Sequence, residues 1–168
     1  MVMNESYKEL LVKKERDMKQ TLLRVACVIP TVVCAAFTLL TGQIVMFIFL
    51  IVCGVLDYFV FQWTDIEYEY LYVDREISID KILAKTRRKK IATIETDKIE
   101  IMAPEKSHQL DSYRNREVKT ADYSAGKDLP DQKLYVIYSE GSKKYLLNLT
   151  EDFAKTVMNI IPRKVFLQ

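Results

Sequence analysis

Four cations follow one another in the sequence, at Arg87, Arg88, Lys89 and Lys90. Such a run attracts anionic surfaces, and near a negatively charged membrane each cation contributes about 1 kcal/mol. Recognition of one particular headgroup would instead need paired donors that converge on a phosphate from different positions. The run therefore indicates either a solvated turn or a surface that makes weak contact with anionic lipid.

A single carboxylate interrupts the apolar part of the chain. Between residues 25 and 63, Asp57 is the only Asp, Glu, Lys, Arg or His. A carboxylate inside a membrane can mark an ion or proton path, but such a path needs several polar groups. Arg24 directly precedes the same stretch, and its long stem can extend toward lipid headgroups. We expect Asp57 either to reach the headgroup layer or to pair with Arg24 on a neighbouring helix.

Residue types that commonly carry catalysis or bind metals are scarce. The three cysteines, Cys27, Cys34 and Cys53, all lie in the apolar stretch, where thiols usually act as small hydrophobic groups. His108 is the only histidine, and four glycines in the whole chain offer no glycine-rich phosphate loop. We therefore expect a protein that is not an enzyme and that has no cofactor and no metal site.

Asp57 and the three cysteines lie in two long apolar runs of the sequence. They cover residues 25–40 and 44–63, and only Thr41, Gly42 and Gln43 separate them. A helix that crosses roughly 30 Å of hydrocarbon needs about 20 residues. So short a polar link is typical of two antiparallel helices joined by a turn. The sequence predicts a two-helix transmembrane hairpin over residues 25–63.

The cations on either side of this hairpin predict its orientation. The turn between the runs carries no Lys or Arg, whereas six precede the first run. These are Lys8, Lys13, Lys14, Arg16, Lys19 and Arg24. Because cationic flanks stay on the cytoplasmic side, we expect a multi-pass protein of the cell (inner) membrane with both termini in the cytoplasm.

The segment before the first run has the composition of a helix. Ser6 and Glu9 have the spacing of a capping box, in which each side chain satisfies a free backbone donor. Good helix formers follow, with Leu11 and Met18 at heptad-like spacing. The sequence predicts an N-terminal cytoplasmic helix over residues 1–24.

After Trp63 the apolar pattern changes to alternation, which is typical of strands. Tyr68, Tyr70 and Tyr72 share one face of the first expected strand. A polar stretch from Pro104 to Glu117 predicts a long mobile loop. The expected strands cover residues 66–73, 75–80, 91–94, 98–103, 118–124, 133–140 and 143–149, and a helix covers residues 150–161. We expect a cytoplasmic domain over residues 64–168 with about seven antiparallel strands and a C-terminal helix.

The order of these patterns resembles the bacterial pleckstrin-homology-like domains that lie beside membrane spans. The matching features are the hairpin Val73-Asp74-Arg75-Glu76, the basic turn from Thr86 to Lys90, and the segment from Ile94 to Ile99. The chain also resembles a group of small two-span bacterial membrane proteins. The resemblance implies an α+β pleckstrin-homology-like fold after the hairpin, and it implies no activity.

Charge balance narrows the possible partners. The net charge is +2, and the part of the chain from Thr64 onward contains 19 basic and 18 acidic residues. The sequence places no group of aromatic residues beside the cations that could stack on nucleic-acid bases. Nucleic acid is therefore not expected as a partner. We expect a membrane-anchored binding or scaffolding protein, whose partners are membrane lipids and either another protein or a second copy. The alternatives are an accessory subunit of a transporter or secretion complex, and a weak anionic-lipid-binding module.

Overall fold

A computed structural model describes residues 7–168 of the chain. Two compact units divide these residues, and each is described here by itself. The hairpin unit contains Glu15–Ile66 and Leu83–Arg87. The sheet unit contains the part before Glu15 together with Glu67–Ile82 and Arg88–Gln168.

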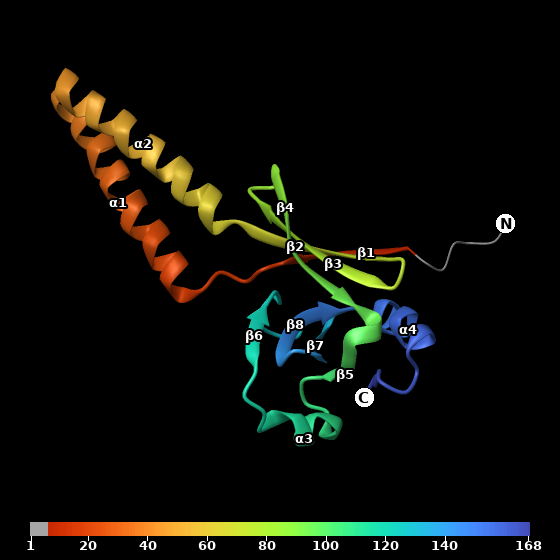
Figure 1. Cartoon of the computed structure of the whole chain (residues 1–168). Helices are drawn as coiled ribbons and strands as arrows, with labels where there is room; N and C mark the ends of the chain where they lie inside the picture. Colours follow the sequence, from red (N-terminus) through yellow and green to blue (C-terminus); the bar gives the residue numbers. More distant parts are fainter. Residues whose placement is uncertain (1–6) are drawn as a thin grey trace. The chain divides into compact units, whose positions relative to one another are not determined.

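The hairpin unit consists mainly of two antiparallel helices (Figure 1). Helix α1 spans Met18–Thr41 and α2 spans Ile44–Thr64. Gly42 ends α1 in the left-handed conformation, at φ 62°, and its N–H donates to the carbonyl of Thr38 at 3.0 Å. A residue without a Cβ suits this position. The predicted pair of helices is therefore confirmed, and both helices are long and apolar enough to cross a membrane.

The first sheet of the sheet unit has the strand order β1-β2-β3-β4. Its strands are β1 (Lys8–Lys13), β2 (Ile66–Val73), β3 (Glu76–Leu83) and β4 (Arg87–Glu95). Tyr68, Tyr70 and Tyr72 are buried, as their alternation predicted. Asp74 and Arg75, both with positive φ, form the tight turn between β2 and β3.

Strand β1 corrects the prediction for the N-terminal segment. The predicted helix is wrong over Lys8–Lys13, which pair antiparallel with β2 from Lys8↔Tyr72 to Lys13↔Glu67. Val12 is completely buried, and this tertiary pairing outweighs the weak helix preference of the segment. Ser6 of the expected capping box lies outside the described residues, and α1 begins only at Met18.

Strand β4 corrects the prediction for the basic run. The turn between β3 and β4 lies at Ala84 and Lys85, which have φ 49° and 58°. Strand β4 then begins at Arg87, so all four cations lie in a strand and not in a turn. The positive-φ turn comes earlier than the charge pattern suggested because the charges themselves do not specify backbone conformation.

The second sheet has the order β5-β7-β8-β6, and the short 3-10 helix η1 (Thr96–Lys98) leads into it. Its strands are β5 (Ile99–Pro104), β6 (Lys119–Asp122), β7 (Lys133–Ser139) and β8 (Lys143–Leu149). The pairs β5–β7 and β7–β8 are antiparallel, but β6 pairs parallel with β8. A parallel pair needs a connection of a dozen or more residues, and residues 123–142, which include β7, join β6 to β8. Residues 105–118 form a second crossover, which carries the chain from β5 at one edge of the sheet to β6 at the other.

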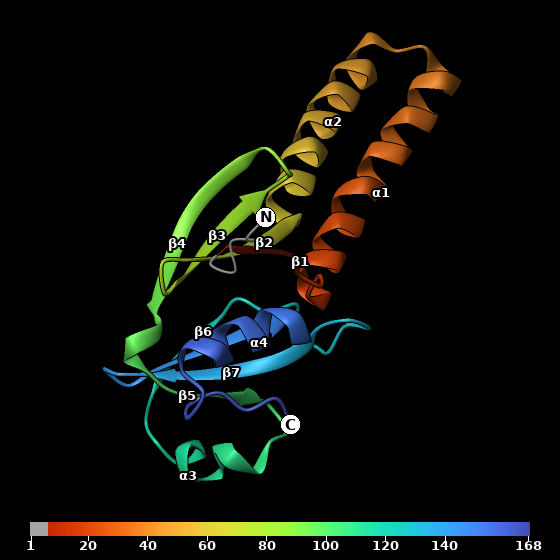
Figure 2. The ribbon, with the colours of Figure 1, turned by 90° about the vertical axis from the view of Figure 1, so that its right-hand side faces the viewer.

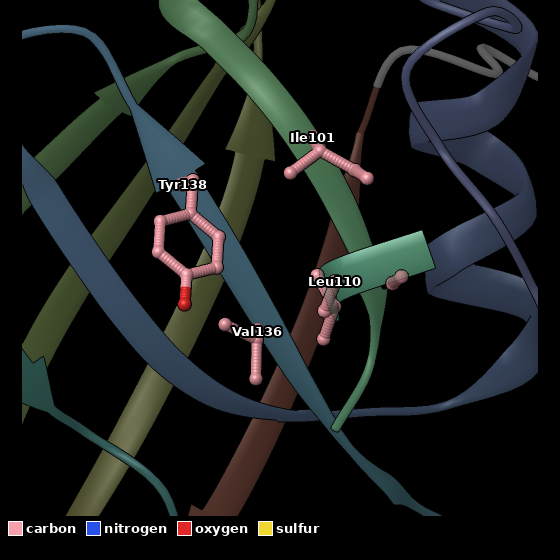
Figure 3. Packing of buried hydrophobic residues seen from close by; sticks show 5 residues of the cluster. Ile101, Leu110, Val136 and Tyr138 are labelled. Atoms are coloured by element: carbon pink, nitrogen blue, oxygen red, sulfur yellow. The ribbon is translucent and has the colours of Figure 1, made fainter. Parts of the chain in front are cut away.

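That crossover is not the irregular loop that the sequence predicted. It contains a second short 3-10 helix, η2 (His108–Leu110), and helix α3 (Asp111–Arg114). Leu110 is buried against Ile101, Ala103, Val136 and Tyr138 in a small apolar cluster (Figure 3). Leu110, together with the partly buried Tyr113 and Val118, holds this mostly polar segment on the sheet.

Helix α4 (Glu151–Ile160) covers the other side of this sheet from α3 (Figure 2). Thr150 Oγ1 accepts a hydrogen bond from the Phe153 N–H at 3.2 Å, as expected for a helix N-cap. Phe153 is buried and meets Tyr72 edge to face, with 6.3 Å between ring centroids. The predicted C-terminal helix is therefore confirmed.

Candidate functional site

The basic strand segment Arg87–Lys90 is exposed on β4, an edge strand of its sheet. Successive side chains of a strand point to opposite faces, so the four cations do not form one row. Arg88 donates to Oε1 of Glu69 at 2.7 Å. For Arg87, Lys89 and Lys90, the structure of residues 7–168 records no ion pair. Three of the four predicted contact residues are therefore free to meet an external anion.

A backbone hydrogen bond ties the turn before β4 to the end of α2. The Ala84 N–H donates to the carbonyl of Asp65 at 3.0 Å, and Asp65 directly follows the last residue of α2. Both residues belong to the hairpin unit, together with Lys85 and Arg87. The start of the basic segment is thus held beside the end of an apolar helix.

Arg24 has a different partner from the one predicted. Its Nε donates to Thr64 Oγ1 at 2.5 Å, and its Nη2 donates to the Phe61 carbonyl at 3.2 Å. The guanidinium also lies over the Phe61 ring, 4.5 Å from the centroid. Of the two alternatives expected for Asp57, the pair with Arg24 is not seen in this structure, where Asp57 accepts from Thr31 and Arg24 donates to Thr64 and Phe61. Arg24 instead closes the open end of the helical hairpin.

Asp57 faces the first helix at a deeper level. Its Oδ2 accepts a hydrogen bond from Thr31 Oγ1 at 2.7 Å. Its Oδ1 is buried and has no hydrogen-bond partner among the described residues. Thr31 was missed at the sequence level because a lone threonine in an apolar run is unremarkable. Its position is meaningful only once the register of the two helices is known.

Two acidic side chains of the sheet unit, Glu9 and Glu69, lie close together, and Glu69 is in contact with Arg88 of the basic strand. The Glu69 side chain is only 2% exposed although it carries a carboxyl group. Glu9, on β1, lies within hydrogen-bonding reach of Glu69, and the Tyr7 hydroxyl donates to Glu9 Oε2 at 2.7 Å. Burial is the main cause that raises the pKa of Glu69, and the Tyr7 hydrogen bond is the main cause that lowers the pKa of Glu9.

Sequence reasoning missed this acidic cluster entirely. Alternation correctly placed Glu67 and Glu69 on the face of β2 opposite the tyrosines, but it did not show that this face is covered. Pairing with β1 and the side chain of Arg88 cover that face locally. The burial therefore depends on a strand far away in the sequence, and no local signal could reveal it.

A hollow of about 440 Å³ opens elsewhere on the sheet unit, near the end of β5. Its apolar lining includes Pro104, Leu129 and Pro130, and its cation Lys106 pairs with Asp128 at 3.1 Å. Within residues 7–168, no group of three or more His, Cys, Asp or Glu side chains is placed to hold a metal ion. The hydroxyl of Ser107, which also lines the hollow, donates to the carbonyl of Gln168 at 2.8 Å.

Two four-stranded sheets with a C-terminal helix, preceded by two long apolar helices, define a pleckstrin-homology-like (PH-like) domain attached to a helical hairpin. The chain belongs to the family described as "Bacterial PH-like domain (DUF6106)", whose model matches residues 4–167. The match includes the apolar helices, so the hairpin is part of the family pattern. No curated protein and no solved structure matches the chain. PH-like domains are typically non-catalytic and often bind lipids or proteins.

Proposed function

We propose that this protein is a membrane-anchored binding module whose basic strand meets anionic lipid headgroups. In this proposal the two apolar helices cross the cell membrane and the PH-like domain stays on the cytoplasmic side. The hydrogen bond between Ala84 and Asp65 carries the proposal, because it holds the start of the basic segment at the end of α2. A helix end at the membrane surface places the next few residues at headgroup level.

The pairing of β1 with β2 supports a two-span arrangement. Strand β1 precedes the helical hairpin and β2 follows it, yet the two strands are neighbours in one sheet. If both helices cross the membrane, the chain returns to the side from which it started, as this pairing requires. The excess of Lys and Arg on these flanks favours the cytoplasmic side.

The charge distribution supports lipid as the partner of β4. Arg87, Lys89 and Lys90 are exposed, and each would gain about 1 kcal/mol near an anionic surface. The attraction is screened by salt and does not depend on the identity of the headgroup. The expected lipid contact is therefore weak and serves to orient the domain, which leaves its other surfaces free for a scaffolding role.

A direct test uses the full chain in vesicles. Cys27, Cys34 and Cys53 are replaced by Ala, and a fluorophore is attached to Thr93→Cys, an exposed position on β4. Quenching by lipids that carry a headgroup quencher should be stronger in anionic than in neutral vesicles, and salt should remove the difference.

A variant of β4 and a control variant of the second sheet distinguish an effect of the β4 cations from an effect of the net charge of the domain. Replacing Arg87, Lys89 and Lys90 by Gln should abolish the difference between the two kinds of vesicle. The matched control replaces Lys119, Lys133 and Lys143, which are exposed cations of the second sheet, by Gln. Equal loss in both variants would show that net charge, and not β4, orients the domain, and this proposal would then fail.

A second candidate function rests on Asp57. Its buried, unpartnered Oδ1 suits a hydrogen-bond donor from a helix of another membrane protein. This observation favours the role of accessory subunit in a transporter or secretion complex. Gentle solubilisation followed by purification should then recover a partner with the wild type and lose it with Asp57→Leu.

A further inference from the structure

The pairing of β1 with β2 brings two carboxyl groups together on one face of the first sheet. Glu9 lies opposite Leu71 and Leu11 lies opposite Glu69. Glu9 and Glu69 are therefore diagonal neighbours on the same face, at a spacing that long side chains can bridge. This face is opposite to the one that carries the buried tyrosines of β2.

The contacts of these two acids require a proton. Arg88 satisfies Oε1 of Glu69, but Oε2 is buried and has no hydrogen-bond donor among the described residues. The neighbouring Glu9 carboxyl can be its partner only if one of the two acids is protonated, because two carboxylates have no hydrogen to share. Tyr7 already donates to Glu9, which stabilises the charged form of that residue. The proton therefore belongs on Glu69 Oε2, from which it is donated to Glu9.

The surrounding charges act in both directions on Glu69. Asp80 on β3 and Glu9 on β1 raise its pKa by repulsion, whereas Arg88 on β4 lowers it. Burial is the largest influence and also raises it. Glu67 lies two residues away on the same strand and adds another acid to this face. Lys13 of β1 lies opposite Glu67 and adds a second base to Arg88 on this face. Burial remains the largest influence, and it favours the protonated state of Glu69.

We propose that Glu9 and Glu69 form a proton-binding pair that controls how firmly β1 is held on the sheet. While the proton is bound, a hydrogen bond links the two strands through their side chains. When it is released to water, two carboxylates face each other across the β1–β2 pair and repel. Val12 and the ion pair between Lys8 and Asp152 still hold β1, so the loss of the proton loosens this strand without unfolding the domain.

The two acids affect the docking of β1 in opposite pH ranges. When β1 is released, Glu9 becomes solvated and Glu69 on β2 loses the cover of β1, so both should titrate closer to the ordinary glutamate value of about 4.3. The raised pKa of Glu69 gives stability that is present below this value and is lost as the pH rises through the folded pKa. The lowered pKa of Glu9 gives stability that is present above the ordinary value and is lost as the pH falls through its folded pKa.

The experiment follows hydrogen exchange of Lys8–Lys13 and the ¹³C signals of glutamate carboxyls in the full chain, in nanodiscs of neutral lipid. Glu69 should titrate above the ordinary range. After correction for intrinsic exchange, the opening constant of β1 should rise by up to about tenfold per pH unit between the ordinary and the raised pKa.

Two variants and one control make the test specific. Glu69→Gln supplies a permanent amide donor and removes the buried titrating group, so it should make β1 exchange independent of pH in this range. Glu9→Gln removes the facing carboxylate and its repulsion while Glu69 stays buried, so it should weaken the pH dependence. Glu9 is exposed, so its variant remains informative even if Glu69→Gln folds poorly. Glu76→Gln, at an exposed position of β3, should keep the wild-type pH dependence. Titration of both acids in the ordinary range, or unchanged pH dependence in the Gln variants, would overturn the proposal.

Discussion

Arg88 donates to the Glu69 carboxyl at 2.7 Å, and of the two side chains only the base is accessible to water: the Arg88 side chain is 58% exposed and the Glu69 side chain 2%. Arg88 therefore differs from its three cationic neighbours, although the sequence shows no difference among them. It stabilises a buried acid of its own sheet, whereas Arg87, Lys89 and Lys90 remain available to an external partner.

Arg88→Gln should lower the stability of the domain by about 1–2 kcal/mol, because it removes the charged donor of a buried carboxyl. Lys89→Gln should change stability by less than about 0.5 kcal/mol, as is usual for exposed residues without a specific contact. Thermal unfolding of the full chain in nanodiscs, followed by the circular dichroism of the strands, measures both. Equal stability of the two variants would show that the ion pair contributes nothing.

Val12→Ala should cost about 2 kcal/mol, because Val12 is completely buried under the first sheet. The matched control is Leu11→Ala in the same strand, since the Leu11 side chain is 49% exposed and should tolerate the change. The same unfolding measurement compares them. If Leu11 proved the more sensitive position, β1 would have the opposite face toward the core.

Reporter fusions at Met1 and at Gln168 should both show a cytoplasmic location. The reason is that β1 and β2 flank the helical hairpin and pair with each other, so both flanks must lie on one side of the membrane. A probe placed in the short turn at Gly42 should react only from the outside. A fusion that reports from the outside at either end would contradict the two-span arrangement.

Asp57→Asn should leave membrane insertion and folding intact, because asparagine can still accept the hydrogen bond from Thr31. Arg24→Leu should instead loosen the open end of the hairpin, since it removes the contacts to Thr64 and Phe61. Protease protection of α1 and α2 in membrane vesicles compares the two variants. Loss of Asp57→Asn from the membrane would assign this carboxyl a structural role that its contacts do not suggest.

Local periodicity was enough to place most elements of the fold. Alternation located β2 to β8, and the N-cap at Thr150 located α4, because these signals lie within the elements themselves. The β1 segment was misread as a helix because its strand partner lies beyond the two apolar helices. Pairing energy from a distant partner outweighs the intrinsic preference of so short a segment.

The candidate site was harder to predict than the fold, because its contacts join residues that are far apart in the sequence. The cations of β4 were visible in the sequence, but the special role of Arg88 depends on Glu69, and the burial of Glu69 depends on β1. Arg24 was expected to meet Asp57 at equal depth, whereas the register of the helices brings it to Thr64. Registers between elements are set by tertiary packing, and no single segment contains that information.

The position of β1 also has a consequence for the order of synthesis. The ribosome produces β1 first, then both apolar helices, and only afterwards β2, the strand with which β1 pairs. In a protein that crosses the membrane twice, a chain with only one inserted helix would keep β1 and β2 on opposite sides. Its β2 edge would stay open, and open edges invite aggregation and proteolysis. If both helices cross the membrane, as proposed, this sheet can close in a chain with both helices inserted but not in one that has stopped after the first.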